Sequence, residues 1–143
     1  MISNTYANKI LDLLCGVRDN LSLPNKLYLG LSSSEPNAST GTVGGEPTAA
    51  SYERIIVGGN DIDTSLKAFG TAANGVIENK IEIQFKTARE SWGTMNYFFL
   101  TDSATNTAAL LWGQITGGVT VAAETVPTFF EGELRISLDM PLT

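Results

Sequence analysis

The order of apolar and polar residues predicts one helix followed by strands. Between about residues 4 and 17, apolar side chains recur at helical spacing, and Ser3 or Asn4 can cap the first turn. The residues on this apolar face are Tyr6, Ile10, Leu13, Leu14 and Val17. The residues that favour its end are Gly16, the pair Asp19-Asn20, and Pro24. Because so short a helix is marginal in water, we expect its apolar face to pack on the protein's own sheet, or else on a neighbouring subunit.

After Pro24 the pattern changes to the alternation that is typical of strands with one buried face. The alternation predicts strands at residues 26–32, 81–86 and 133–140, and shorter ones at 52–57 and 119–121. In the last of the longer strands, the residues expected to face inward are Leu134, Ile136, Leu138 and Met140. Residues 62–71 are ambiguous. Residues 33–51 show no period and predict a long loop of the kind that is often functional or mobile.

A hairpin is predicted at residues 88–115, where two Trp-Gly pairs flank a polar turn at 102–106. Tyr97 and Phe99 fall on one face of its first strand, and Phe98 and Leu100 fall on the other. Both faces are therefore apolar, and we expect an opposing sheet to cover one and the helix or a partner subunit to cover the other. A strand of this kind favours an assembled protein.

The sequence thus predicts six to eight short strands without helices between them, which disfavours a parallel α/β sheet. The expected fold class is mainly β, an antiparallel β-sandwich (Ig-like or jelly-roll-like) or a barrel, with one short N-terminal helix. Residues 1–143 are expected to form a single domain, with the helix at about residues 4–17 and the long loop at about 33–51.

The composition of the chain limits the partners and the cellular compartment that we expect for it. The net charge of −6, with only 9 Lys and Arg residues, disfavours nucleic acid as a partner. No apolar run approaches the ~20 residues of a membrane span, and the N-terminus lacks a signal-peptide pattern. We therefore expect no membrane partner and synthesis in the cytoplasm. The single cysteine, Cys15, cannot form an internal disulfide and is expected to be a small buried residue of the helix.

Candidate chemistry is sparse. The chain has no histidine, which removes the commonest general base and metal ligand, and one cysteine cannot build the usual zinc sites. Asp61 and Asp63 vaguely resemble the start of a calcium loop, but the later glycine and glutamate are missing, which favours a polar turn. The glycine-rich residues 41–45 lack the phosphate-loop pattern. We therefore expect no enzyme, with no catalytic, cofactor-binding or metal-binding residues and no cofactor.

The aromatic residues of the hairpin allow two interpretations. They are Trp92, Tyr97, Phe98, Phe99 and Trp112. Exposed, they would form a platform for sugars. At alternating spacing in a hairpin, however, aromatic side chains are more typically core residues and cross-strand partners, and we favour the core interpretation.

Several short motifs resemble a family of small virion proteins of tailed bacteriophages, often labelled tail-fibre proteins. The matching elements are the N-terminal helix, Leu27-Tyr28-Leu29-Gly30-Leu31, Glu35-Pro36, Gly44-Gly45, Ser51-Tyr52-Glu53-Arg54, Ile83-Gln84-Phe85-Lys86-Thr87-Ala88, Trp92-Gly93-Thr94, Thr101-Asp102-Ser103-Ala104, Leu110-Leu111-Trp112-Gly113, Gly132-Glu133-Leu134 and Ser137-Leu138. The resemblance covers nearly the whole chain, apart from an extra segment between Gly58 and Ala73.

The resemblance implies a structural role in the virion without catalysis. Because the chain has no repeats from which to build a long shaft, our leading hypothesis is a protein that decorates and stabilises the capsid surface (a cement protein). Its partners would be other virion proteins, namely the major capsid protein or tail proteins, and copies of itself in a homo-oligomer such as a trimer. The loop at 33–51 and the helix would be the contact arms. The alternatives are a tail-tip or tail-fibre component that binds host-surface glycans, and a carbohydrate-active enzyme.

Overall fold

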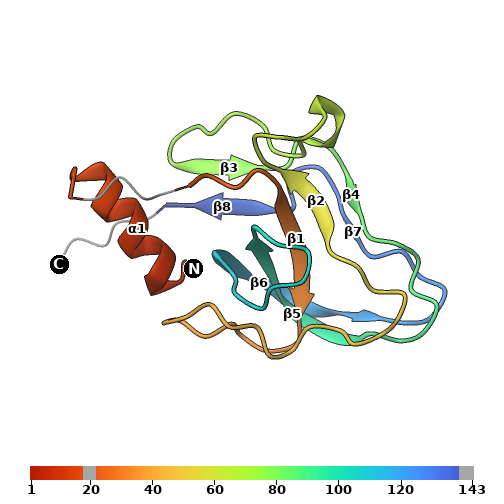
Figure 1. Cartoon of the computed structure of the whole chain (residues 1–143). Helices are drawn as coiled ribbons and strands as arrows, with labels where there is room; N and C mark the ends of the chain where they lie inside the picture. The colour runs from red at the N-terminus through yellow and green to blue at the C-terminus, as the bar shows by residue number, and fades with distance from the viewer. Residues whose placement is uncertain (18–21, 139–143) are drawn as a thin grey trace.

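The structure is a computed structural model that describes residues 1–17 and 22–138 (Figure 1). In this part of the chain, one α-helix precedes eight strands and a short 3-10 helix. They are α1 (Asn4–Leu14), β1 (Leu27–Ser32), β2 (Ile55–Gly58), η1 (Thr64–Leu66), β3 (Val76–Glu78), β4 (Ile83–Gln84), β5 (Gly93–Thr101), β6 (Leu111–Val121), β7 (Thr128–Phe129) and β8 (Arg135–Ser137). All strand pairs are antiparallel, which confirms the mainly β fold class with one N-terminal helix. The single domain over residues 1–143 stays a prediction.

The larger sheet has the strand order β2-β1-β5-β6 and contains the predicted hairpin. Strand β6 is longer than the sequence indicated, because it runs through Gly117 and Gly118 to Val121 instead of breaking before residue 119. Both glycines have positive φ angles, and the register of β5 against β6 shifts between Met95 and Tyr97. A bulge therefore takes up the two glycines without ending the strand.

The second layer consists of two short sheets, β3-β8 and β4-β7. Residues 68–70 join it to the larger sheet, since Ala68 N donates to Val57 O (2.9 Å) and Gly70 N donates to Glu78 O (3.0 Å). At the opposite side, no backbone hydrogen bond joins β6 to β7 or β8 within the described residues. The two layers therefore form a sandwich-like structure that is closed along one side and open along the other.

The main core lies between these two layers. Its buried residues include Leu29, Leu31, Val57, Ile83, Phe85, Met95, Phe98, Leu100, Val121 and Leu134. Each such side chain contributes about 1.5–3 kcal/mol by leaving water. This cluster explains the alternation in residues 26–32 and 81–86, although Ile81 is exposed.

A second, smaller core lies on the other face of the larger sheet, where Phe99 and Trp112 pack with Val43 and Ala109. As predicted, both faces of β5 are buried. The expectation that the helix or a partner covers this second face is wrong, because the loop at 33–51 covers it. Val43 N donates to Thr107 O (2.8 Å), and Val43 itself is buried. The apolar character of β5 is therefore satisfied within the chain and gives no evidence of assembly.

Helix α1 begins where the sequence indicated. The Ser3 hydroxyl accepts a hydrogen bond from Tyr6 N (3.2 Å), which is the predicted cap. The helix ends at Leu14, and none of its eleven residues is buried. The expected packing of its apolar face on the protein's own sheet is therefore wrong. Cys15, expected to be buried, is exposed after the last turn. The pair Asp19-Asn20 lies outside the described residues.

The C-terminal strand is shorter than predicted. Of the residues expected to face inward, Leu134 is fully buried, Ile136 is half-buried and Leu138 is 76% exposed, while Met140 lies outside the described residues. Leu138 follows β8 at the open side, where no strand of the described residues covers it.

Candidate assembly surface

The acidic residues form no recognisable reaction centre or ion site in the described part of the chain. No three His, Cys, Asp or Glu residues there are grouped as metal ligands would be. The Asp63 carboxylate instead accepts hydrogen bonds from Ser65 N (2.9 Å) and Ser65 Oγ (3.0 Å), which hold the pKa of Asp63 below its usual value. This geometry is the predicted polar turn. Within the same residues, no helix is both long and apolar enough to cross a bilayer.

The hairpin aromatic residues are core residues. Trp92, Phe98, Phe99 and Trp112 are buried, with Trp112 only 2% exposed, and Tyr97 is half-buried. The Trp112 ring nitrogen donates to Glu35 Oε1 at 3.4 Å. These side chains therefore form no exposed platform for a sugar.

Two of the resemblance motifs depend on glycine for steric reasons. A Cβ atom on Gly113 would lie 2.6 Å from Cζ of Phe98, and one on Gly30 would lie 2.2 Å from Cζ of Phe99. The rings of β5 therefore occupy the space above both glycines. The Trp112-Gly113 pair serves packing between β5 and β6.

Another motif, Ser51-Tyr52-Glu53-Arg54, supplies a buried ion pair that we call the Arg54 clamp, formed by Glu46, Tyr52, Arg54 and Ser103. Arg54 donates from Nε to Glu46 Oε2 (2.8 Å) and from Nη2 to Glu46 Oε1 (2.9 Å). Its Nη1 donates to Ser103 O (2.8 Å), and Tyr52 OH donates to Glu46 Oε2 (2.9 Å). The clamp fastens the loop at 33–51 to β2 and to the hairpin turn.

The sequence did not indicate the partners of the Arg54 clamp, because Glu46 lies in a loop without a period. Nor did it single out Asn79, whose fully buried amide donates to Ile81 O and Phe130 O while its Oδ1 accepts from Leu134 N (2.9 Å). Both groups fix loops that have no hydrophobic pattern. We assign a structural role to the Arg54 clamp and to Asn79, since their side-chain polar atoms are hydrogen-bonded within the chain.

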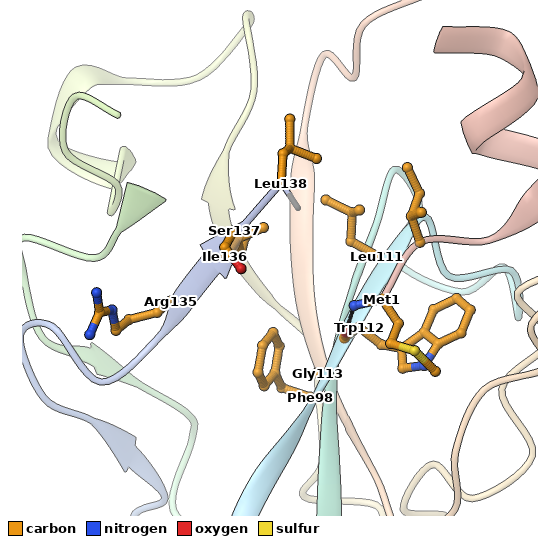
Figure 2. A pocket seen from close by; sticks show the side chains of 10 residues that line it. Met1, Phe98, Leu111, Trp112, Gly113, Arg135, Ile136, Ser137 and Leu138 are labelled. Carbon is orange, nitrogen blue, oxygen red and sulfur yellow. Dashed lines mark hydrogen bonds between the residues drawn. The ribbon is translucent and has the colours of Figure 1, made fainter. Parts of the chain in front are cut away.

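Two apolar clefts lie along the open side of the sandwich. The first has a volume of about 330 Å³ and lies between β6 and β8, as Figure 2 shows. Leu111 lines it from β6, Ile136 lines it from β8, Leu138 lies at its rim, and the Phe98 ring lies between the two strands. Arg135 is the one charged side chain that lines it.

The second cleft has a volume of about 360 Å³ and lies between β6 and β7. Ile115 and Val119 line it from β6, and Phe129 lines it from β7. Phe98 lines both clefts, and its ring lies edge-on to that of Phe129, with 6.2 Å between the centroids. An apolar groove therefore accompanies β6 along much of its length.

The outer edge of β6 is covered at one end only. There the N-terminal residues add a short extended segment, since Trp112 N donates to Met1 O (2.9 Å) and Ser3 N donates to Leu110 O (3.1 Å). From residue 114 to residue 120, no backbone hydrogen bond leaves the side of β6 that faces away from β5. We call this stretch the β6 edge. Within the described chain it is an open sheet edge.

The β6 edge contains the bulge at Gly117 and Gly118, but it lacks two other features that protect sheet edges, charged side chains and proline. Natural proteins protect such edges with charged side chains or proline. Residues 103–123 contain neither a charge nor a proline. An open, uncharged edge beside an apolar groove is a surface that fits another polypeptide chain.

Comparison of the sequence with known proteins identifies a family. No curated protein matches the chain. A family model described as podophage GP4 fiber I protein gp80 matches residues 1–137. This match confirms the resemblance to phage tail-fibre proteins that the motifs indicated. Since it covers nearly the whole sequence, the chain belongs to this family of phage fibre virion proteins.

Proposed function

We propose that this chain is a non-enzymatic structural component of a phage tail fibre and that it acts by binding other virion proteins through the β6 edge. Membership of a fibre-protein family supports the location in the tail fibre. The open β6 edge carries the proposal of binding, because it leaves the outer backbone donors and acceptors of an edge strand available to a partner.

Strand addition is the binding mode that fits this surface. An extended segment that pairs with a sheet edge gains affinity from main-chain hydrogen bonds and specificity from side chains in adjacent pockets. The two clefts provide such pockets on the side of β7 and β8. The partner segment would be extended and largely apolar, because the groove is lined mainly by apolar side chains.

The family match moves the preference from the capsid to the fibre. Decoration of the capsid rested on the absence of repeats, which a long shaft would need. A unit without repeats can equally serve as a knob or an attachment unit of a fibre. Recognition of host glycans has no support from the hairpin aromatic residues, because their rings are buried.

Antibody labelling of intact virions tests the location. Antibodies against the exposed hairpin turn at residues 102–106, coupled to gold particles, should decorate the tail in electron micrographs. Label on the capsid shell would return the preference to the decoration hypothesis. Particles that carry no label and no copy of the chain by mass spectrometry would refute both.

A further inference from the structure

The loop between η1 and β3 ends in a tight turn that carries the one Asn-Gly pair of the sequence, Asn74-Gly75. Ala73 and Val76 flank the pair and exchange both backbone hydrogen bonds, since Ala73 N donates to Val76 O (2.9 Å) and Val76 N donates to Ala73 O (3.0 Å). The φ angle is 54° at Asn74 and 75° at Gly75. A two-residue loop with positive φ at both positions is a type I′ turn, which Asn-Gly strongly favours.

The atoms of this pair that could react with each other have no hydrogen-bond partners. Asn74 is exposed. Within the described residues, neither its side-chain amide nor the backbone N–H of Gly75 is hydrogen-bonded. Gly75 has no side chain, so nothing on this residue hinders the approach of its nitrogen to the side-chain carbonyl of Asn74. Asparagine is among the thermolabile residues of proteins, and here its amide is unprotected.

We propose that Asn74-Gly75 is a site of spontaneous covalent modification, at which Asn74 loses its side-chain amide. The backbone nitrogen of Gly75 attacks Cγ of Asn74, and the new N–Cγ bond closes a cyclic imide. The Cγ–Nδ2 bond breaks, and the amide nitrogen leaves as ammonia with the proton that the Gly75 nitrogen gives up. One water molecule then opens the imide at either carbonyl. The product is aspartate, or isoaspartate, in which the main chain runs through the side chain.

The turn has to open for this reaction, because its two hydrogen bonds hold the backbone of Asn74 in the turn conformation. Little resists the opening. Strands β3 and β8, which the turn precedes, pair over three residues each, and neither strand has a buried residue. Segments with few buried contacts open locally at low free-energy cost. Such openings take microseconds to seconds, so they recur many times before a slow covalent step occurs.

A modification at this turn reaches the first cleft through one hydrogen bond. Leu138 N donates to Gly75 O (3.0 Å), and Leu138 lies at the rim of that cleft. Isoaspartate lengthens the main chain by one carbon atom, and a two-residue turn cannot take up this atom and keep both of its φ angles and its register. We therefore expect the end of β8 to loosen when Asn74 is modified. This effect goes beyond the proposed function and does not depend on it.

Peptide mapping by mass spectrometry tests the proposal on the purified full-length chain, kept folded in mildly alkaline buffer. Trypsin cleaves after Lys67 and Lys80 and so releases residues 68–80, in which Asn74 and Asn79 are the two asparagines. Asn79 is the internal control, because it is fully buried and its amide is hydrogen-bonded. Fragment spectra show which of the two has gained the mass of deamidation.

Asn106 is the second control, since it is exposed in the hairpin turn but precedes Thr107, whose branched side chain hinders the approach of the backbone nitrogen. Deamidation at Asn74 should be at least about tenfold faster than at Asn79 and Asn106, because only glycine leaves the attacking nitrogen unhindered. The incubation continues until Asn106 has measurably reacted. An Asn74 that keeps its amide at that time, or that reacts no faster than Asn106, would overturn the proposal.

Hydrogen exchange at Leu138 tests the effect on the cleft, with Asn74→Gly as the matched variant. Gly-Gly also favours a type I′ turn, so this variant keeps the turn and lacks the reacting amide. After the incubation, the Leu138 N–H of the wild-type chain should have lost protection, and that of Asn74→Gly should have kept it. An equal loss in both chains, or no loss in a wild-type chain whose Asn74 has reacted, would refute the coupling between the turn and the first cleft.

Discussion

At the scale of single residues, the Arg54 clamp is the polar interaction from which we expect a clear contribution to stability. Arg54 is 2% exposed and its partner carboxylate on Glu46 is 26% exposed, so both charges are largely removed from water. A buried pair is weak evidence of net stabilisation, yet removal of one partner strands the other charge. The side chain of Arg54 also covers the Phe99 ring at 5.1 Å. The clamp therefore couples the loop at 33–51 to the second core.

We expect Arg54→Met to lower the free energy of unfolding by about 2–4 kcal/mol, somewhat less than for a fully buried pair because Glu46 retains some water. Urea unfolding measures the loss. The double variant Arg54→Met with Glu46→Leu removes both charges and should recover part of it. A single variant as stable as the wild type would show that the clamp does not hold the loop.

Tyr52 gives the clamp a dependence on pH. Burial, reinforced by the negative charge of Glu46, raises the pKa of Tyr52 above its ordinary value near 10. The folded chain then keeps the phenolic proton at a pH where the unfolded chain releases it. The resulting stability is complete below pH 10 and is lost as the pH rises above it, at about 1.4 kcal/mol per pH unit.

Tyr52→Phe should therefore flatten the alkaline loss of stability between about pH 10 and 11.5. At pH 7 the variant should be less stable by about 1–3 kcal/mol, because the backbone N–H of Leu31 loses its acceptor, the Tyr52 hydroxyl. Chemical denaturation at several pH values measures both effects. If the free energy of unfolding fell equally with pH for the wild type and Tyr52→Phe above pH 10, the raised pKa of Tyr52 would be contradicted.

At the scale of elements, the sequence predicted what periodicity can express. Strand β1 and the β5–β6 hairpin were found because Leu29, Leu31 and the hairpin aromatic residues alternate over long segments. Strands β3 and β7 span three and two residues, too few to show a period, and exist because β8 and β4 pair with them. The amphipathic pattern of α1 indicated a face to be buried, but a pattern does not identify the surface that buries it.

Strand β6 is the element on which the proposed function depends. We expect Thr116→Lys, at the β6 edge and lining the second cleft, to reduce incorporation of the chain into virions by at least tenfold, because a lysine there opposes strand addition. Quantitative mass spectrometry of purified particles measures incorporation. The matched control is Thr105→Lys, an exposed threonine in the hairpin turn.

The free energy of unfolding of both lysine variants should lie within about 0.5 kcal/mol of the wild-type value, since both threonines are exposed. Equal incorporation of Thr116→Lys and Thr105→Lys would exclude the β6 edge as the contact surface. An equal loss of incorporation in both variants would indicate that any added positive charge disturbs assembly. That result would also remove the argument that the β6 edge is the contact surface.

At the scale of the whole molecule, the sequence predicted the fold class and the family but not the candidate surface. The motifs that carry the resemblance turned out to serve packing: Gly30 and Gly113 make room for rings, and Tyr52 and Arg54 hold a loop. The β6 edge has no motif of its own. It arises because the second layer pairs with β2 through residues 68–70 and leaves β6 without a partner, a consequence of strand order that no local pattern contains.

A cryo-EM map of the intact virion is the most direct test of the central claim, that this chain is a fibre component that binds a neighbouring chain through the β6 edge. The claim predicts density for this sandwich in the tail fibre, with an extended segment of a neighbouring chain paired along residues 114–120. Density for the fold on the capsid shell, or in the fibre with the β6 edge facing solvent, would contradict it.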